Sequence, residues 1–178
     1  MASPVGHAMA GVTCAAAVSA VAGAPDGVVF WAGAIVAAGA PDLDFVPYVL
    51  GLGSSRCHRG PSHSLLTIGA TIVAVLLVSS TGIVPVDGRH LAAWSAALLS
   101  HPLLDLLTTG PRIAADGSGI ALFWPLSNRR QHLRRPLFEQ DGRWLSCRSP
   151  RCMLRLLTPE LLWLGPLCAI VSVISLLR

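Results

Sequence analysis

Five apolar stretches, separated by short polar segments, dominate the pattern of this chain. They run over about 8–24, 28–40, 64–84, 89–109 and 157–177. A helix needs about 20 apolar residues to cross a hydrocarbon core that is ~30 Å thick, and four of the stretches come close to this length. The 28–40 stretch is shorter, so the sequence leaves open whether it spans fully. The pattern predicts an all-α fold, a polytopic membrane bundle of four to five helices.

Length and composition favour one integral membrane domain. Apolar residues make up 53% of the 178 residues and charged residues only 12%, about half of the roughly 25% that is typical of soluble domains. One domain, 1–178, is expected at this length. Its parts are a core at 1–126 that carries the candidate site, an arginine-rich segment at 127–156 and a carboxyl-terminal transmembrane helix at 157–177.

The distribution of arginine predicts the topology. The segment from about 110 to 156 is rich in arginine, and the positive-inside rule places it in the cytoplasm. Alternating the stretches from this anchor, through a tight turn at 24–27, places the 41–63 loop and the amino terminus in the cytoplasm too. The carboxyl end then lies outside. Of the 13 arginines, 11 fall inside and only Arg89 and Arg178 fall outside.

The 89–109 stretch carries His101 and Asp105, four residues apart and therefore on one face of a helix. Ionisable side chains within an apolar helix are costly unless they are paired or bound to an ion, so by default they indicate a functional site. Pro102 is expected to kink the helix beside His101. The alternative is a hydrogen-bonded His–Asp pair that only joins two helices.

Two carboxylates, Asp42 and Asp44, directly follow the second apolar stretch. Carboxylate oxygens bind both hard divalent cations and zinc. In an extended or turn segment the two side chains point the same way, whereas in a helix they do not. In a helix, at least one of the two carboxylates would hold a metal ligand in place instead of binding the metal itself. The alternative is a solvated helix end after Pro41, because Pro–Asp pairs are common in turns.

A third element opens the 64–84 stretch, where His58 and His63 flank a Gly–Pro turn. Imidazole is the commonest metal-binding side chain, and a helix amino terminus also favours a bound anion. Arg59 either contacts a phosphoryl group through its planar set of donors or serves only as a juxtamembrane arginine. Ser62 or Ser64 is expected to cap the helix.

His7, which precedes the first stretch, gains weight from the topology alone, because the other candidate ligands gather on its side of the membrane. The set then comprises four histidines and three aspartates: His7, His58, His63 and His101 with Asp42, Asp44 and Asp105. This is more than the four ligands of one zinc ion, so two or three ions are expected. Clusters of this kind activate water and hold phosphoryl oxygens.

Two further polar motifs have structural interpretations. The Thr-Pro-Glu sequence at 158–160 has an N-cap, a first-turn proline and an early acidic residue, all typical of a helix start. The Phe-Trp-Pro sequence at 123–125 is typical of an anchor at the membrane interface. Neither motif is expected to belong to the site.

The cysteines and arginines also have simple interpretations. The five cysteines are odd in number and lack the spacing of a disulfide framework, which favours a reducing compartment. Cys147 and Cys152 with His132 form only a weak zinc pattern. The arginines have no interleaved aromatic residues, so attraction to anionic lipid explains them and no nucleic-acid partner is expected.

In their order along the chain, these motifs resemble the YdjM-type family of inner-membrane proteins, described as metal-dependent hydrolases and in some members as LexA-regulated. The resemblance covers about 1–126. It rests on His7 after Gly6, Pro41-Asp42-Leu43-Asp44, His58-Arg59-Gly60-Pro61-Ser62-His63-Ser64-Leu65, Ser100-His101 with Asp105, and Leu122-Phe123-Trp124-Pro125. The family is distantly similar to zinc-dependent phospholipase C and P1-type nucleases, all-helical phosphodiesterases with zinc clusters. The resemblance therefore implies a metal core of that kind, to which the spacing of His101 and Asp105 carries over best.

Residues and resemblance together predict a membrane-embedded, metal-dependent hydrolase of the bacterial inner membrane. Its site would lie at the cytoplasmic interface, within reach of membrane lipid and of an amphiphilic or phosphoester substrate. The predicted ligands of a divalent metal, expected to be Zn²⁺, are His7, Asp42, His58, His63, His101 and Asp105. Asp44 is expected to be a ligand or general base, and Arg59 a phosphate contact.

Two other functions fit the same residues. A metal-ion or proton transporter would also place His and Asp within the membrane, but its ligands should lie near the bilayer midplane, whereas these gather on one side. A noncatalytic membrane scaffold would bind metal without turning over any ester.

Overall fold

The computed structural model is all-helical, as predicted, and it describes residues 2–23, 27–52, 58–83, 86–114, 119–138 and 147–177. The long helices are α1 (Pro4–Ala22), α2 (Val28–Gly39), α4 (Leu65–Ser80), α5 (Gly88–Thr108) and α7 (Pro150–Leu176). Short helices lie between them: η1 (Ala40–Phe45), α3 (Val46–Val49), η3 (Pro61–His63) and α6 (Pro111–Ala114). Within the described residues, the only β pairing is an isolated bridge between Ile120 and Gln131.

Among the described residues, four helical segments are long and apolar enough to cross a membrane: α1, α2 continued by η1 as Val28–Phe45, α5 and α7. The second apolar stretch reaches this length because η1 extends α2 to 18 residues. By contrast, α4 has 16 residues and ends at Ser80, short of the predicted 84. The turn predicted at 24–27 lies, except for Gly27, outside the described residues.

Small side chains let the central helices α1, α2 and α5 approach closely. The buried core consists of Phe30 and five alanines: Ala15, Ala34, Ala38, Ala93 and Ala97. A Cβ atom on Gly11 of α1 would lie 2.6 Å from the carbonyl oxygen of Ala34 in α2. Since lipid gives helices little hydrophobic reason to associate, close packing of this kind is what holds a membrane bundle together.

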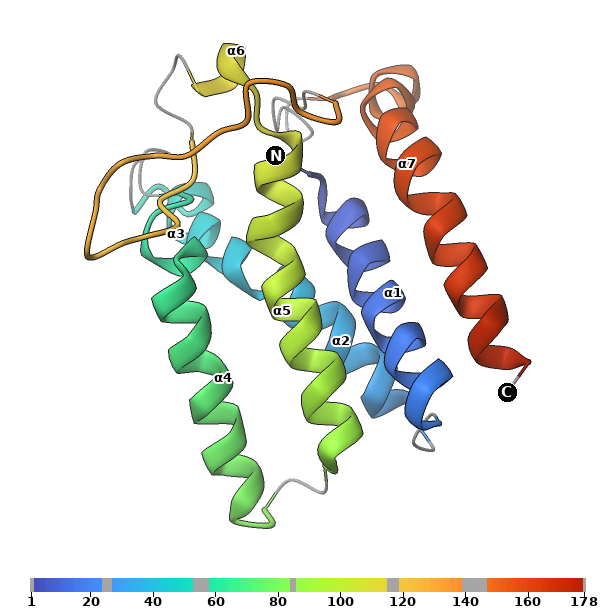
Figure 1. Ribbon diagram of the computed structural model, residues 1–178. Helices are drawn as coiled ribbons and strands as arrows, with labels where there is room; N and C mark the ends of the chain where they lie inside the picture. The colour runs from blue at the N-terminus through green and yellow to red at the C-terminus, as the bar shows by residue number, and fades with distance from the viewer. Residues whose placement is uncertain are drawn as a thin grey trace.

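The long helices alternate in direction, so the polar segments gather at one end of the bundle (Figure 1). The start of α1, η1, η3, the end of α5 and the start of α7 all lie there, and the segment after α6 crosses over this end. The carboxyl end of α7 lies at the opposite end. This is the arrangement that alternation predicted, and it brings distant parts of the sequence together.

The helix α7 begins earlier than its sequence motif indicated. The Thr-Pro-Glu sequence at 158–160 predicts a helix start, but Pro150 is the first residue of α7 and Ser149 is its N-cap. Proline is tolerated within membrane helices because side chains satisfy the freed backbone groups. The Thr158 hydroxyl donates to the carbonyl of Leu154, 2.7 Å away, as side chains inside a helix commonly do. The motif is therefore internal to the helix, and it places Glu160 in the protein interior.

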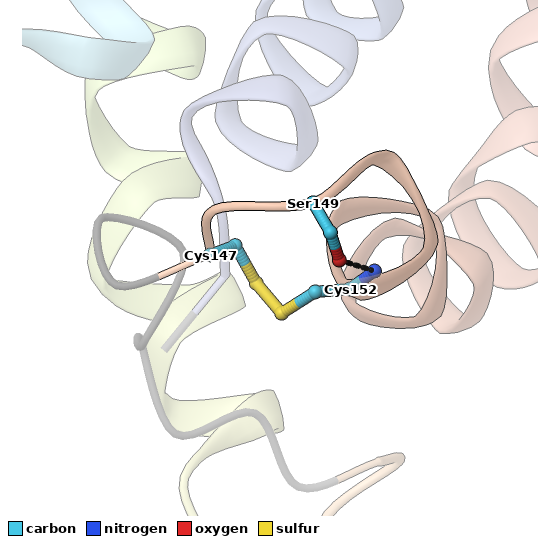
Figure 2. The surroundings of a disulfide bond; sticks show 3 residues. All are labelled: Cys147, Ser149 and Cys152. Carbon is cyan, nitrogen blue, oxygen red and sulfur yellow. Dashed lines mark hydrogen bonds between the residues drawn. A yellow bond between two sulfur atoms is a disulfide. The ribbon is translucent and has the colours of Figure 1, made fainter.

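The early start of α7 also brings two cysteines together. Cys147 and Cys152 form a disulfide, which the expectation of reduced cysteines missed (Figure 2). The Ser149 hydroxyl accepts a hydrogen bond from the backbone N–H of Cys152 and so fixes the first turn that folds Cys152 back toward Cys147. The spacing of the two cysteines in the sequence does not predict this disulfide. With a helix start predicted at Thr158, nothing in the sequence indicates the helical turn that brings Cys152 back toward Cys147.

Candidate metal centre

The first turn of α1 carries His7. Ser3 is the N-cap of α1, and its side chain accepts a hydrogen bond from the N–H of Gly6, 3.2 Å away. Ser3 is itself held by Glu160 of α7, whose carboxyl group accepts hydrogen bonds from both the backbone N–H and the hydroxyl of Ser3. His7 is fully buried, and its ring stacks on that of His101 at a centroid distance of 3.8 Å.

The last two turns of α5 carry His101 and Asp105, both fully buried. The Nδ1 of His101 donates to the carbonyl oxygen of Ala38 at 2.6 Å. This leaves a lone pair on Nε2 directed into the site, the usual arrangement of a metal-binding histidine. Asp105 Oδ1 accepts from the N–H of Ala2 at 3.0 Å, while Oδ2 faces His63 Nε2 at 3.5 Å.

The helix η1 supplies the two other carboxylates. Asp42 Oδ1 lies 3.4 Å from His101 Nε2, 3.5 Å from His63 Nε2 and 3.7 Å from His58 Nε2. Asp44 points elsewhere. It binds His58 Nδ1, and it accepts from the hydroxyl of Ser62 and from the backbone N–H of Arg59. Asp42 thus lies at the centre of the cluster, and Asp44 orients His58.

The loop before η3 is held in an unusual conformation. Arg59 has a φ of 61°, a left-handed conformation that is uncommon for any residue other than glycine and that is often found at functional sites. Its carbonyl accepts from the N–H of Ala121 at 3.1 Å. The guanidinium of Arg130 donates to the carbonyls of His58 and Arg59, at 3.2 and 3.4 Å. The segment that follows α6 therefore fixes the loop from outside.

The spacing of the ligand atoms fits a metal cluster. Two atoms bound tetrahedrally at about 2.0 Å from zinc lie about 3.3 Å apart. Here His101 Nε2 lies 3.0 Å from His63 Nε2 and 3.4 Å from Asp42 Oδ1, and His7 Nε2 lies 3.4 Å from Asp105 Oδ1.

Unsatisfied polar atoms point to the same centre. Among the described residues, four buried atoms that face it have no hydrogen-bond partner: His7 Nε2, Asp42 Oδ1, His58 Nε2 and Asp105 Oδ2. Buried polar atoms are rarely left unpaired, so these residues fit a group of positive charge placed between them.

Three overlapping sets of side chains could each hold an ion: His7, His101 and Asp105; Asp42, His63 and His101; and Asp42, Asp44 and His58. The sets are not independent. His101 offers one free nitrogen, because its Nδ1 is bound to Ala38, whereas the two oxygens of Asp42 can serve two ions. The first two sets therefore compete for His101, while the last two share Asp42.

The carboxylates of the cluster shift the pKa values of two basic groups in the loop, His63 and Arg59. Burial lowers the pKa of His63, but the carboxylates of Asp105 and Asp42, each 3.5 Å from its Nε2, outweigh burial and raise the pKa to about 9. Burial also lowers the pKa of Arg59, against the opposite effect of Asp105 and Asp42. Without a bound cation, His63 holds a proton that balances the carboxylates, and a bound metal would displace it.

The structure brings all of the predicted ligands and Arg59 into one site, although they come from four separate segments. Sequence analysis missed the groups that support them: the carbonyl of Ala38, Ser62, Arg130 and Glu160. A carbonyl has no sequence signal, and Arg130 was one arginine of many. Glu160 did have a signal, an acidic residue in an apolar stretch, but its Thr-Pro context suggested a helix start.

Comparison with known proteins places the chain among inner membrane proteins. The family model described as YdjM inner membrane protein matches residues 1–177. The inner membrane protein YbcI of Escherichia coli (strain K12) is 34% identical over 107 residues, which cover 54% of this chain and 53% of the relative. The chain thus aligns with about half of the length of this curated relative. No solved structure matches the chain, and the similarity to phospholipase C stays a prediction. With its helical bundle and a match over nearly its whole length, the chain belongs to the YdjM inner membrane protein family.

Proposed function

We propose that this protein is a membrane-embedded, metal-dependent hydrolase that acts on a phosphoester at the end of the bundle where the His and Asp residues meet. The observation that carries the proposal is the convergence of these residues, with ligand atoms of His101, His63 and Asp42 only 3.0–3.5 Å apart. Apolar side chains would stabilise this end of the bundle at least as well as a dense, buried cluster of His and Asp that partly lacks hydrogen-bond partners. This comparison supports a functional role for the cluster.

The residues at the centre divide into three roles. His7, His58, His63, His101, Asp42 and Asp105 would hold two divalent ions, expected to be Zn²⁺. When bound, such ions lower the pKa of water and neutralise charge on phosphoryl oxygens. Arg59, whose Nε lies 3.9 Å from Asp105 Oδ2, would contact a phosphoryl group of the substrate. Asp44, left open by the sequence as a ligand or general base, is instead proposed to position His58.

Metal content and turnover test the proposal together. The purified protein in detergent should contain about two transition-metal ions per chain by elemental analysis, and it should hydrolyse bis(4-nitrophenyl) phosphate or phospholipid vesicles. Removing the metal with a chelator should abolish hydrolysis, and adding Zn²⁺ should restore it. Folded protein without metal would contradict the proposal, and bound metal without turnover on any ester would indicate a scaffold.

Replacing Asp44 by asparagine should weaken metal binding without removing it. The substitution preserves the size of the side chain but takes away the charge that orients His58 through Nδ1. Loss of such a supporting carboxylate typically costs about 10–100-fold in metal affinity. Competition with a fluorescent zinc chelator measures this change. An unchanged affinity would show that Asp44 does not position a ligand, and complete loss of metal would make Asp44 a ligand itself.

We further propose that the metal centre faces the cytoplasm. The arginines support this placement, because in the described residues Arg89 lies at the far end of α5 while Arg59, Arg112 and the arginines of 129–135 and 148–155 lie at the site end. The disulfide between Cys147 and Cys152, at the same end, favours the opposite side, since cytoplasmic thiols are kept reduced. The positive-inside rule governs the orientation in which the helices insert into the membrane, so we base the proposed side of the metal centre on the arginines.

The two placements differ in a simple assay. With the site in the cytoplasm, alkaline phosphatase fused to the carboxyl end of α7 should be active, and a fused green fluorescent protein should stay dark. A fluorescent fusion together with an inactive phosphatase fusion would place the site in the periplasm.

A further inference from the structure

An apolar groove runs along α4 on the side that faces α2 and α5. It consists of two adjoining cavities of about 260 and 330 Å³. Thr71, Val75 and Trp94 line both of them; the first reaches Ala40 and Leu98, and the second reaches Val86. The groove is therefore continuous along about two turns of α4.

The groove exists because α4 packs loosely on the bundle. In Figure 1, α4 stands beside α5 at the edge of the molecule, apart from α1 and α7. Ile68 is the only buried residue in α4, all of which the structure describes. Trp94 forms a fixed wall of the groove, because its indole N–H donates to the carbonyl of Phe30 at 3.0 Å and its ring occupies the space where Gly33 lacks a Cβ atom.

One end of the groove lies next to the metal centre. Ala40 precedes Asp42 by two residues, and Leu98 lies about one turn before His101 on α5. Ala37, which also lines the groove, is adjacent to Ala38, the residue whose carbonyl holds His101. A molecule in the groove would thus have one end at the ligands of the proposed cluster.

The groove has the length and polarity of one lipid chain. Its lining on α4 runs from Thr71 to Ser79, which is about 12 Å along the helix. Acyl chains of one leaflet extend through half of a hydrocarbon core ~30 Å thick, about 15 Å, so the groove covers most of one chain. The lining is almost wholly aliphatic, aromatic or small, and in the membrane it would be surrounded by lipid rather than water.

We propose that this groove binds an acyl chain of the substrate, whose phosphoester then reaches the metal centre. The inference rests on the proposed function and makes it narrower: the substrate class is a membrane amphiphile with a long alkyl chain, not a soluble phosphodiester. The basic side chain of Arg59 near the cluster and the apolar groove below it match the two ends of such a molecule.

A pair of tryptophan substitutions on α4 tests the inference. Thr71 faces the groove, so Thr71→Trp should fill it. Val73 is 54% exposed on the same helix and lies outside the groove lining, so Val73→Trp is the matched control. Native mass spectrometry in detergent, after addition of dioleoyl phosphatidylglycerol, should show bound lipid in the wild type and Val73→Trp, and at least 10-fold less in Thr71→Trp. Equal metal content in all three proteins would show that Thr71→Trp folds.

Turnover separates this inference from the proposed function. Thr71→Trp should hydrolyse the long-chain phospholipid at least 10-fold more slowly while its activity on bis(4-nitrophenyl) phosphate is unchanged. Equal lipid retention and equal long-chain activity in both variants would overturn the groove proposal and leave the hydrolase standing. Lipid lost only from Thr71→Trp, in a protein that cleaves neither substrate, would support the groove and overturn the hydrolase.

Discussion

Alanine in place of His101 should remove both the bound metal and the hydrolytic activity. His101 is fully buried, its Nε2 is within 3.4 Å of both His63 Nε2 and Asp42 Oδ1, and it belongs to two of the three sets that could hold an ion. Because loss of a supporting partner alone costs about 10–100-fold, loss of this ligand should reduce activity by more than about 100-fold. Elemental analysis and hydrolysis of bis(4-nitrophenyl) phosphate measure the two effects.

Two further variants separate metal loss from unfolding. Asp105→Asn keeps an oxygen that can accept from the N–H of Ala2 but loses the charge that faces His7 and His63, so it should lose metal while staying folded. His90→Ala removes another histidine of α5, one that belongs to the capping box at the far end of the helix. It should cost about 1 kcal/mol of stability and keep its metal. Metal and activity retained in His101→Ala would refute the ligand assignment.

Removing the carboxyl group of Glu160 should produce the largest loss of stability outside the metal centre. Glu160 is the one buried residue among those described in the 27-residue helix α7, and its carboxyl group accepts two hydrogen bonds from Ser3 at the start of α1. Hydrogen bonds to charged groups contribute about 1.5–3 kcal/mol each. Glu160→Ala should therefore lower the free energy of unfolding by about 3 kcal/mol, measured by thermal or denaturant unfolding in detergent.

The same variant should also weaken metal binding, because Ser3 caps the helix turn that carries His7. Ser175→Ala provides the matched control, since the Ser175 hydroxyl donates to Ser19 at 2.7 Å and joins the same two helices away from the site. That variant should cost about 1 kcal/mol or less, as measured for hydrogen bonds between membrane helices, and leave metal affinity unchanged. Equal effects of the two substitutions would show that Glu160 has no special role in holding α1.

The sequence predicted the helices, and the gathering of the His and Asp side chains at one end of the bundle, for reasons that are local. Apolar stretches of about 20 residues are long enough to be membrane helices. Buried His and Asp side chains within them raise the free energy of the folded protein unless they are paired or bound to an ion, so they indicate a functional site. The spacing of His101 and Asp105 already placed both on one face of α5. Alternation of the helices then predicted that His7, the 42–44 carboxylates and His63 would lie at the same end, as they do.

The predictions from the sequence were wrong where a local motif fits two different structures. Thr-Pro-Glu at 158–160 is a good helix start by its composition, yet α7 begins at Pro150 because Ser149 caps it there. The same misplaced boundary hid the pairing of Cys147 with Cys152. A proline inside an apolar helix and a proline at its start look alike in sequence, and only packing against α1 distinguishes them.

The sequence by itself thus determined which stretches are helical, which polar side chains are unfavourable in lipid, and at which end of the bundle they meet. Only the tertiary structure decided how they divide their roles. Asp42 faces three histidines while Asp44 turns to His58 and Ser62, Glu160 holds the start of α1, and α4 stands far enough from α2 and α5 to leave a groove. These features depend on distances between segments that are far apart along the chain, and no local pattern of residues encodes such distances.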